Sequence, residues 1–162
     1  MGSTPNQQPD PGRRRIVSGR VFPSPLPDVY AALSKPNRLA TWWGPEGFTN
    51  SIEEFDLRPG GRWRLVMKGP HGDAFRNESR FVEVVPNERI VFDHLEPIHA
   101  FRMTQLLESV GGGTRLTWTM EFEREEECAR VREFIESANE QNFDRLARHL
   151  GEAAATRSPQ LP

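Results

Sequence analysis

Two hydrophobic periods divide this chain. From Phe48 to Glu123, apolar and polar residues tend to alternate, which is typical of strands that bury one face. Turn-forming sequences such as RPGG, GPHGD, VPNE and VGGG separate the alternating runs. The pattern predicts six strands, with the sequences FTNSIEEFDL, RWRLVMK, FRNESRFVEVV, RIVFDHLE, AFRMTQLLES and GTRLTWTMEF. Because their connections are short, these strands should form an antiparallel meander.

The second period is helical and flanks the meander. From Glu125 to about Leu150, apolar residues recur at helical spacing, which predicts one long helix. The residues expected on its inward face are Val131, Ile135, Ala138, Asn142 and Leu146. Before the meander, RRIVSGRVF predicts a first strand, and SPLPDVYAALSKPNRLATWWG predicts two short helices that end at Gly44-Pro45. The order predicts an α+β fold in which a curved sheet of seven strands grips the last helix.

Length and composition narrow the picture further. The 162 residues fit one domain at 13–152, with polar, proline-rich segments 1–12 and 153–162 expected to be disordered tails. A net charge of −2, from 21 basic and 23 acidic residues, argues against nucleic-acid binding. The single cysteine, Cys128, rules out an internal disulfide. Neither a bilayer-spanning apolar run nor a signal peptide is present, so a cytoplasmic location is expected.

Several motifs in a fixed order carry a family resemblance. The sequences LATWWGPEGF, FDLRPGGRWRLVMKGPHGD, EVVPNERIVF, GGGTRLTWTMEF and NFDRLARHL together resemble the START-like (SRPBCC) superfamily. Within it they are most similar to the branch named after the activator of the heat-shock protein 90 ATPase, the AHSA-type proteins. The similarity spans roughly Arg13 to Leu150 and implies the helix-grip fold, with a cavity between the sheet and the C-terminal helix. Because relatives include lipid carriers, receptors, cyclases and a co-chaperone, the resemblance implies a fold more than one activity.

Inward positions of the predicted strands carry side chains suited to line such a cavity. Tryptophan and methionine are bulky and adaptable, and a few polar groups among them are typical of a small-molecule site. Asn77 and Gln105 lie between apolar neighbours on such faces, and His94 and His99 are further polar candidates. The alternative for these side chains is a plain core, or a hydrogen-bonded or surface position.

The adjacent pair Trp42 and Trp43 extends this set. Neighbours on a helix point about 100° apart, so one ring can pack beneath the sheet while the other stands near the cavity mouth. The alternative is that both rings only anchor the short helices. The candidate ligand-binding residues are Trp42, Trp43, Trp63, Leu65, Met67, Asn77, Phe92, Met103, Gln105, Trp118, Met120, Phe134 and Ala138.

A catalytic or metal-binding motif is not legible. The serines have no G-x-S-x-G setting, and the four histidines lack the spacing of zinc ligands. Successive carboxylates such as Glu53 and Glu54 point to opposite faces of one strand, which suits a solvated edge. Cys128 lies among glutamates, which disfavour a reactive thiolate. No catalytic residue, metal or cofactor is therefore expected.

The sequence favours a protein that binds a small hydrophobic molecule, aromatic or lipid-like, in the cavity between the sheet and the last helix. Two alternatives stay open. One is a stress-response module linked to heat-shock protein 90, which rests on the resemblance alone, and the other is a hydrolase or cyclase that uses the same cavity. Nucleic acid and a membrane span are not expected, whereas a homodimer and a chaperone partner are left open.

Overall fold

The computed structural model describes residues 11–96 and 99–157. A 3₁₀ turn, η1 (Pro11–Arg14), leads into β1 (Arg15–Phe22), which is followed by α1 (Leu26–Ser34) and α2 (Pro36–Trp42). The meander consists of β2 (Thr49–Phe55), β3 (Arg62–Lys68), β4 (Ala74–Val85), β5 (Arg89–Glu96), β6 (Phe101–Val110) and β7 (Gly113–Phe122). The last element is α3 (Glu125–Arg157). Residues 1–10 and 158–162, which make up most of the two predicted tails, lie outside the described residues.

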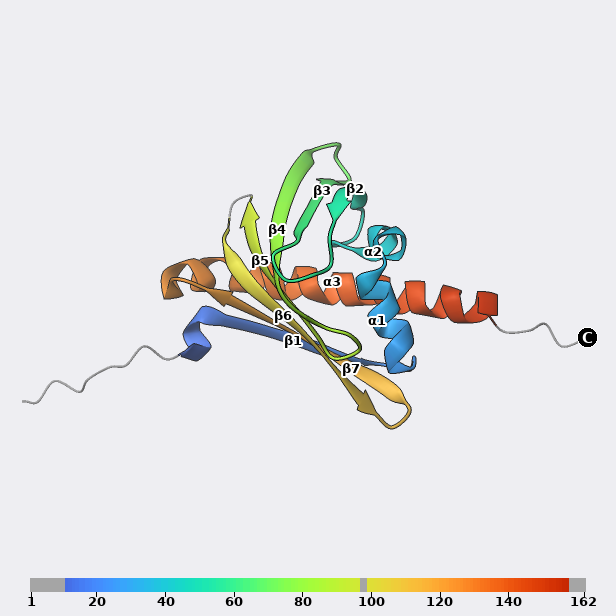
Figure 1. Cartoon of the computed structure of the whole chain (residues 1–162). Helices are drawn as coiled ribbons and strands as arrows, with labels where there is room; N and C mark the ends of the chain where they lie inside the picture. The colour runs from blue at the N-terminus through green and yellow to red at the C-terminus, as the bar shows by residue number, and fades with distance from the viewer. Residues whose placement is uncertain (1–10, 97–98, 158–162) are drawn as a thin grey trace, which may run out of the picture.

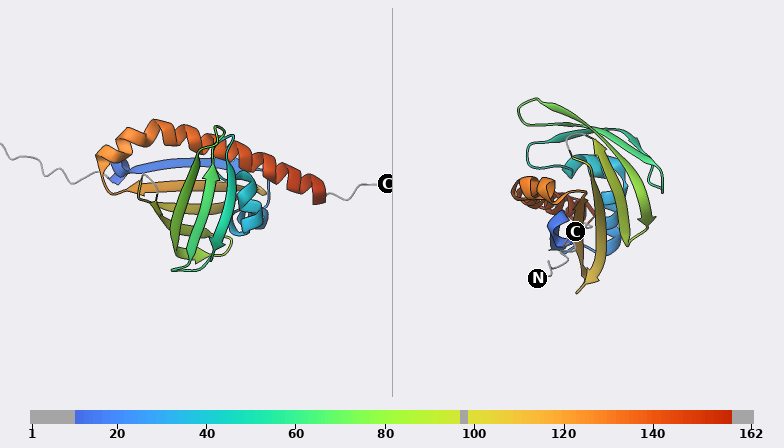
Figure 2. Two further views of the ribbon diagram at one scale, coloured as in Figure 1. Left: turned by 90° about the horizontal axis from the view of Figure 1, so that it is seen from above. Right: turned by 90° about the vertical axis from the view of Figure 1, so that its left-hand side faces the viewer.

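The strands form one sheet in the order β1-β7-β6-β5-β4-β3-β2, with every neighbouring pair antiparallel. The sheet is strongly curved, and α3 runs along its concave side (Figures 1 and 2). The two short helices lie beside the C-terminal half of α3 (Figure 1). This arrangement confirms the predicted α+β helix-grip fold with seven strands.

Helix α3 extends past Leu150, where the sequence pattern ends it, to Arg157. Its sheet-facing side is buried, as the helical spacing predicts, and includes polar as well as apolar side chains. The buried residues of α3 are Cys128, Val131, Asn139, Asn142, Phe143, Leu146 and Leu150. Three glutamates occupy the first turn, where the helix dipole favours negative charge.

The tryptophan pair lies at the point where α2 gives way to an extended segment. Lys35 is extended and separates α1 from α2, and Pro36 then begins α2 because its fixed φ suits a first helical turn. The helix ends at Trp42, earlier than the predicted end at Gly44-Pro45. Trp43 is already extended, with φ −65° and ψ 136°, and Gly44 follows with φ +94°, a left-handed conformation that favours glycine. The backbone therefore leaves the helix between the two indoles, whose rings meet edge-on with centroids 5.6 Å apart.

Trp42 belongs to the core. Its side chain is 1% exposed, and its ring stacks on that of Trp118 with centroids 6.4 Å apart. The indole Nε1 donates a hydrogen bond to the carbonyl oxygen of Ala32 in α1, at 3.1 Å. Trp42 thereby ties both short helices to the sheet.

Candidate functional site

A pocket of about 230 Å³ lies between the concave face of the sheet and α3. We call it the sheet–helix pocket. Strands β3 to β7 supply one wall, the Trp43–Gly44 segment closes one side, and α3 supplies the other wall. Its lining residues are Trp43, Gly44, Trp63, Leu65, Met67, Asn77, Ser79, Phe92, His94, His99, Phe101, Met103, Trp118, Met120, Ile135, Ala138, Asn139 and Asn142. The lining is mostly apolar, with eight tryptophan, phenylalanine and methionine side chains beside six polar ones, a composition typical of small-molecule sites.

Strand register decides which side chains meet in the sheet–helix pocket. Trp63 on β3 pairs with Ser79 on β4, Ser79 pairs with His94 on β5, and His94 pairs with Phe101 on β6. Residues paired in this way point to the same face of a sheet. A second row joins Phe92 to Met103 and Met120. The first row thus places the polar residues Ser79 and His94 side by side, and the second row is apolar.

Three indole rings gather at the apolar side. The ring of Trp43 lies 5.0 Å from that of Trp63 and 5.4 Å from that of Trp118, measured between centroids. Trp63 also meets the ring of Phe92 edge-on at 5.2 Å. Within the part of the chain that the structure describes, the indole nitrogens of Trp63 and Trp118 are buried without a hydrogen-bond acceptor. Such donors favour a bound group that can accept a hydrogen bond.

Side chains of α3 hold the segment that carries Trp43. The Asn142 amide donates to the carbonyl oxygen of Trp42 at 2.8 Å and accepts from the backbone N–H of Gly44 at 3.1 Å. The Arg145 guanidinium donates to the carbonyl oxygens of Thr41, Trp43, Gly44, Pro45 and Phe48 at 2.9 to 3.2 Å. Burial lowers the pKa of Arg145 from its ordinary value. The position of Trp43 in the wall therefore depends on α3.

The polar end of the sheet–helix pocket centres on His94. Its ring stacks on that of Phe101, with centroids 4.7 Å apart. Its Nε2 lies 3.0 Å from Asn77 Oδ1, and its Nδ1 lies 2.8 Å from the carbonyl oxygen of His99. The His99 Nδ1 is in turn 2.9 Å from a carboxylate oxygen of Glu127 at the start of α3. Two histidines and an acid are therefore linked at this end.

Burial lowers the pKa of His94 below the ordinary histidine value, and burial also lowers that of His149, which contacts Arg38 and Thr41. The unfolded chain then binds these protons at higher pH than the folded chain. The free energy of unfolding should therefore fall as the pH drops below about 6.5. Urea unfolding at pH 7.5, 6.5 and 5.5 measures how the free energy of unfolding depends on pH. The variant His94→Gln should show a weaker dependence, of which the contribution of His149 is left. Equal slopes in the two proteins would contradict a depressed pKa at His94.

Most of the residues that the sequence analysis selects line the sheet–helix pocket. They are Trp43, Trp63, Leu65, Met67, Asn77, Phe92, Met103, Trp118, Met120 and Ala138. Three others lie elsewhere. Trp42 is in the core because it is still helical, and Gln105 is buried at 3% exposure beside the lining residue Trp118. Phe134 is 76% exposed and lines a separate hollow beside α3.

The structure adds residues to the pocket that the candidate set omits. Ile135 and Asn142 belong to the inward face of α3 that the helical period predicts, and Asn139, which that prediction omits, lies beside them. Ser79 and Phe101 occupy the strand faces on which alternation places them, although neither is among the candidate ligand-binding residues. Glu127 does not line the pocket but contacts the lining residue His99. Nothing in the sequence marks it beyond its place in the first turn of α3.

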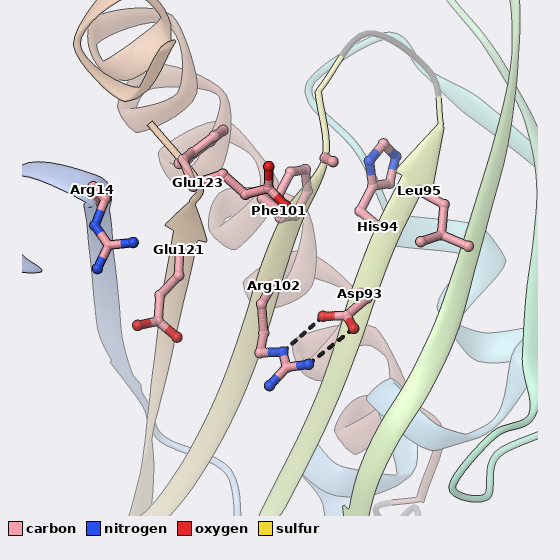
Figure 3. Close-up of a pocket in the computed structure, with 10 residues that line it drawn as sticks. Arg14, Asp93, His94, Leu95, Phe101, Arg102, Glu121 and Glu123 are labelled. Atoms are coloured by element: carbon pink, nitrogen blue, oxygen red, sulfur yellow. Dashed lines mark hydrogen bonds and ion pairs between the residues drawn. The ribbon is translucent and has the colours of Figure 1, made fainter. Parts of the chain in front are cut away.

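Two other hollows differ in character from the sheet–helix pocket. One of about 410 Å³ lies at the ends of β5, β6 and β7, where Asp93 and Arg102 form an ion pair at 2.7 Å (Figure 3). His94 and Phe101 line both this hollow and the sheet–helix pocket. The other, of about 340 Å³, lies between α3, which contributes Phe134 and Ala138, and the segments around Phe48 and Pro70.

Other functional groups are sparse in the described ranges. Across residues 11–96 and 99–157, no three His, Cys, Asp or Glu side chains are arranged to hold a metal ion. In the same ranges, no helix combines the length and the apolar character needed to cross a membrane. Cys128 is buried, and burial raises the pKa of its thiol, which disfavours the reactive thiolate.

Sequence comparison identifies the family. A family model described as "Activator of Hsp90 ATPase homolog 1-like protein" matches residues 23–151, which include every strand of the meander and most of α3. The chain belongs to this family. Membership in this AHSA1-like family confirms the resemblance noted in the sequence and supports, at the family level, a ligand-binding domain. No curated protein sequence matches the chain.

Solved structures give the same result for the AHSA1-like fold. A protein from Nitrosomonas europaea is similar with a TM-score of 0.81 at 22% identity, over 88% of this chain and 97% of that one. A protein from Chromobacterium violaceum gives a TM-score of 0.74 at 28% identity, over 83% and 95% of the two chains. The AHSA1 protein from Silicibacter pomeroyi gives 0.71 at 21% identity, over 86% and 99%.

Proposed function

We propose that this AHSA1-like protein binds a small, mostly apolar molecule in the sheet–helix pocket. The observation that carries the proposal is the lining itself, in which three tryptophans and three methionines surround a few polar groups. Methionine adapts to different shapes, and tryptophan offers a large apolar face. The few polar groups would fix the orientation of the ligand.

The size of the pocket limits the ligand. Its volume of about 230 Å³ falls below the roughly 300–1,000 Å³ of most drug-sized sites. It exceeds the cavity of about 150 Å³ that suffices for benzene in an engineered protein core. A molecule with one or two aromatic rings therefore fits the proposal better than a long lipid.

Tryptophan fluorescence provides the direct test, because three of the four tryptophans line the pocket. Neutral two-ring probes such as naphthalene and 2-naphthamide should quench or shift the emission and raise the melting temperature. Binding that occurs only in the folded state stabilises it in proportion to the logarithm of ligand concentration. If a panel of one- and two-ring probes leaves both emission and melting temperature unchanged, the proposed function is wrong.

Ala138→Trp should abolish this binding at a modest cost in stability. Ala138 is partly exposed and lines the pocket from α3, so a larger side chain would grow into open space. Overpacking a closed core would instead cost about 1–3 kcal/mol. Glu133→Trp, at an exposed position of the same helix, is the matched control and should bind like the wild type. Binding that survives Ala138→Trp would place the ligand elsewhere.

A further inference from the structure

His94 faces more hydrogen-bond acceptors than a neutral imidazole can satisfy. A neutral imidazole carries one N–H, whereas the imidazolium carries two. The carbonyl oxygen of His99, 2.8 Å from Nδ1, can only accept. Asn77 Oδ1, 3.0 Å from Nε2, also accepts. With only one proton on the ring, the unprotonated ring nitrogen would face an acceptor oxygen, and the lone pairs of the two atoms would repel.

Exchanging the amide oxygen and nitrogen of Asn77 does not remove the conflict. In the present orientation the Asn77 Nδ2 donates to the carbonyl oxygen of Phe75 at 3.1 Å. After the exchange, Oδ1 would face that carbonyl, so the unfavourable contact would only move. A second proton on His94 satisfies all of these groups at once. The geometry therefore favours the imidazolium, while burial opposes it.

A buried imidazolium needs a nearby negative charge. The described residues that line the sheet–helix pocket include no carboxylate. From α3, the Glu127 carboxylate contacts His99 instead. From β4, Asn77 and Ser79 do not titrate. The missing charge must therefore come from outside this lining.

Three of the charged groups on the other side of His94 form ion pairs. They line the hollow at the ends of β5, β6 and β7 (Figure 3). Asp93 of β5 pairs with Arg102 of β6, and Glu121 of β7 pairs with Arg15 of β1. The remaining charged groups of this hollow are Arg14 of η1 and Glu123 after β7. This open, charged side gives His94 a route for protons from solvent.

The polar row offers donors to a bound anion. Ser79 pairs with both Trp63 and His94 across the strands, and all three line the pocket. Trp63 is 2% exposed, and its indole N–H has no acceptor among the described residues. A carboxylate at this end could accept from the indole N–H and the Ser79 hydroxyl and lie close to the charge of His94.

We propose that the sheet–helix pocket takes apolar carboxylic acids, and that His94 takes up one proton when the carboxylate binds. This inference rests on the proposed function and adds the ligand class and its link to pH. In the bound state, the proton forms an N–H bond at the imidazole nitrogen that was unprotonated. The ligand enters as the carboxylate, with the proton drawn from solvent, so the complex gains no net charge.

The test uses 2-naphthoic acid, with 2-naphthamide as its neutral counterpart. Titration calorimetry near pH 7 in two buffers with different ionisation enthalpies counts the protons bound with the ligand. The acid should bind with uptake of about one proton, and its dissociation constant should rise by up to about tenfold per pH unit above neutrality. The amide should bind without proton uptake and without this pH dependence.

Two variants locate the proton. His94→Gln should lose the proton uptake and weaken binding of the acid, yet retain binding of the amide. His71→Gln, at an exposed histidine of the β3–β4 connection, is the matched control and should behave like the wild type. If His94→Gln does not fold, the proton count of the wild type still decides, together with the shift of its His94 ring resonances on binding.

The outcomes separate this inference from the proposed function. If the acid binds the wild type without proton uptake, or if His94→Gln retains the uptake, the inference is wrong while the pocket remains a ligand site. If only the amide binds, the inference is also wrong. If neither probe binds, the proposed function fails together with the inference.

Discussion

Trp42→Ala should lower the free energy of unfolding by about 3–5 kcal/mol, the range for truncating a large buried aromatic side chain. Trp42 is 1% exposed, so the change leaves a cavity where α2 packs on the sheet. It also removes the ring stacked on Trp118 and the donor to the Ala32 carbonyl oxygen. Since small domains are stable by only about 5–15 kcal/mol, a loss of this size should be evident in urea unfolding.

Two further variants serve as controls. Trp43→Ala should cost less stability because Trp43 is only partly buried and lines the pocket, and ligand binding should be its main loss. Phe134→Ala, at a side chain 76% exposed, should change stability by no more than about 0.5 kcal/mol. If Trp43→Ala is as destabilising as Trp42→Ala, the two adjacent rings do not have the separate roles described here.

Periodicity explains why the fold could be predicted from the sequence. Strands alternate with a period of two and helices repeat with a period of 3.6, so the meander and α3 have distinct patterns. Short turns then leave an antiparallel order as the simplest arrangement. The end of α2 is harder to predict from the sequence. Gly44-Pro45 sets the last position that the helix could reach, but the helix can end before it. The backbone already leaves the helix at Trp43.

The residues of the candidate site could likewise be predicted only in part. Alternation within one strand identifies inward residues such as Met67 and Trp118, which line the pocket. It does not say which strands bring their polar residues side by side. The contact of His94 with Asn77 depends on the register of β4 against β5, which shifts between Glu78 and Ser79. Such bulges are set by the whole sheet and have no signal in either strand alone.

Arg145 is the clearest residue that sequence reasoning could not identify. An arginine in the polar part of an amphipathic helix is ordinarily expected to face solvent. Here its guanidinium lies against the end of α2 and the segment after it, and donates to five backbone carbonyl oxygens there. Only the folded arrangement of two segments about a hundred residues apart in sequence produces this contact.

Arg145→Met should lower the free energy of unfolding by about 2–4 kcal/mol, because several partly buried carbonyl oxygens lose a charged donor at once. Methionine keeps much of the apolar stem, so the loss reports the hydrogen bonds more than the packing. Trp43, whose carbonyl oxygen is one of the acceptors, should become more mobile. The variant should therefore also bind two-ring probes less tightly, as measured by tryptophan quenching at temperatures where it remains folded.

Arg148→Met is the matched control for Arg145→Met. Arg148 is on the same helix, its side chain is 60% exposed, and it pairs with Glu46 at 2.6 Å. An exposed ion pair of this kind contributes only about 0–1 kcal/mol, and its removal should leave probe binding unchanged. Equal losses in the two variants would mean that the carbonyl contacts of Arg145 add nothing beyond a surface charge. A stable Arg145→Met that still binds probes normally would show that Asn142, Asn50 and the core hold Trp43 without Arg145.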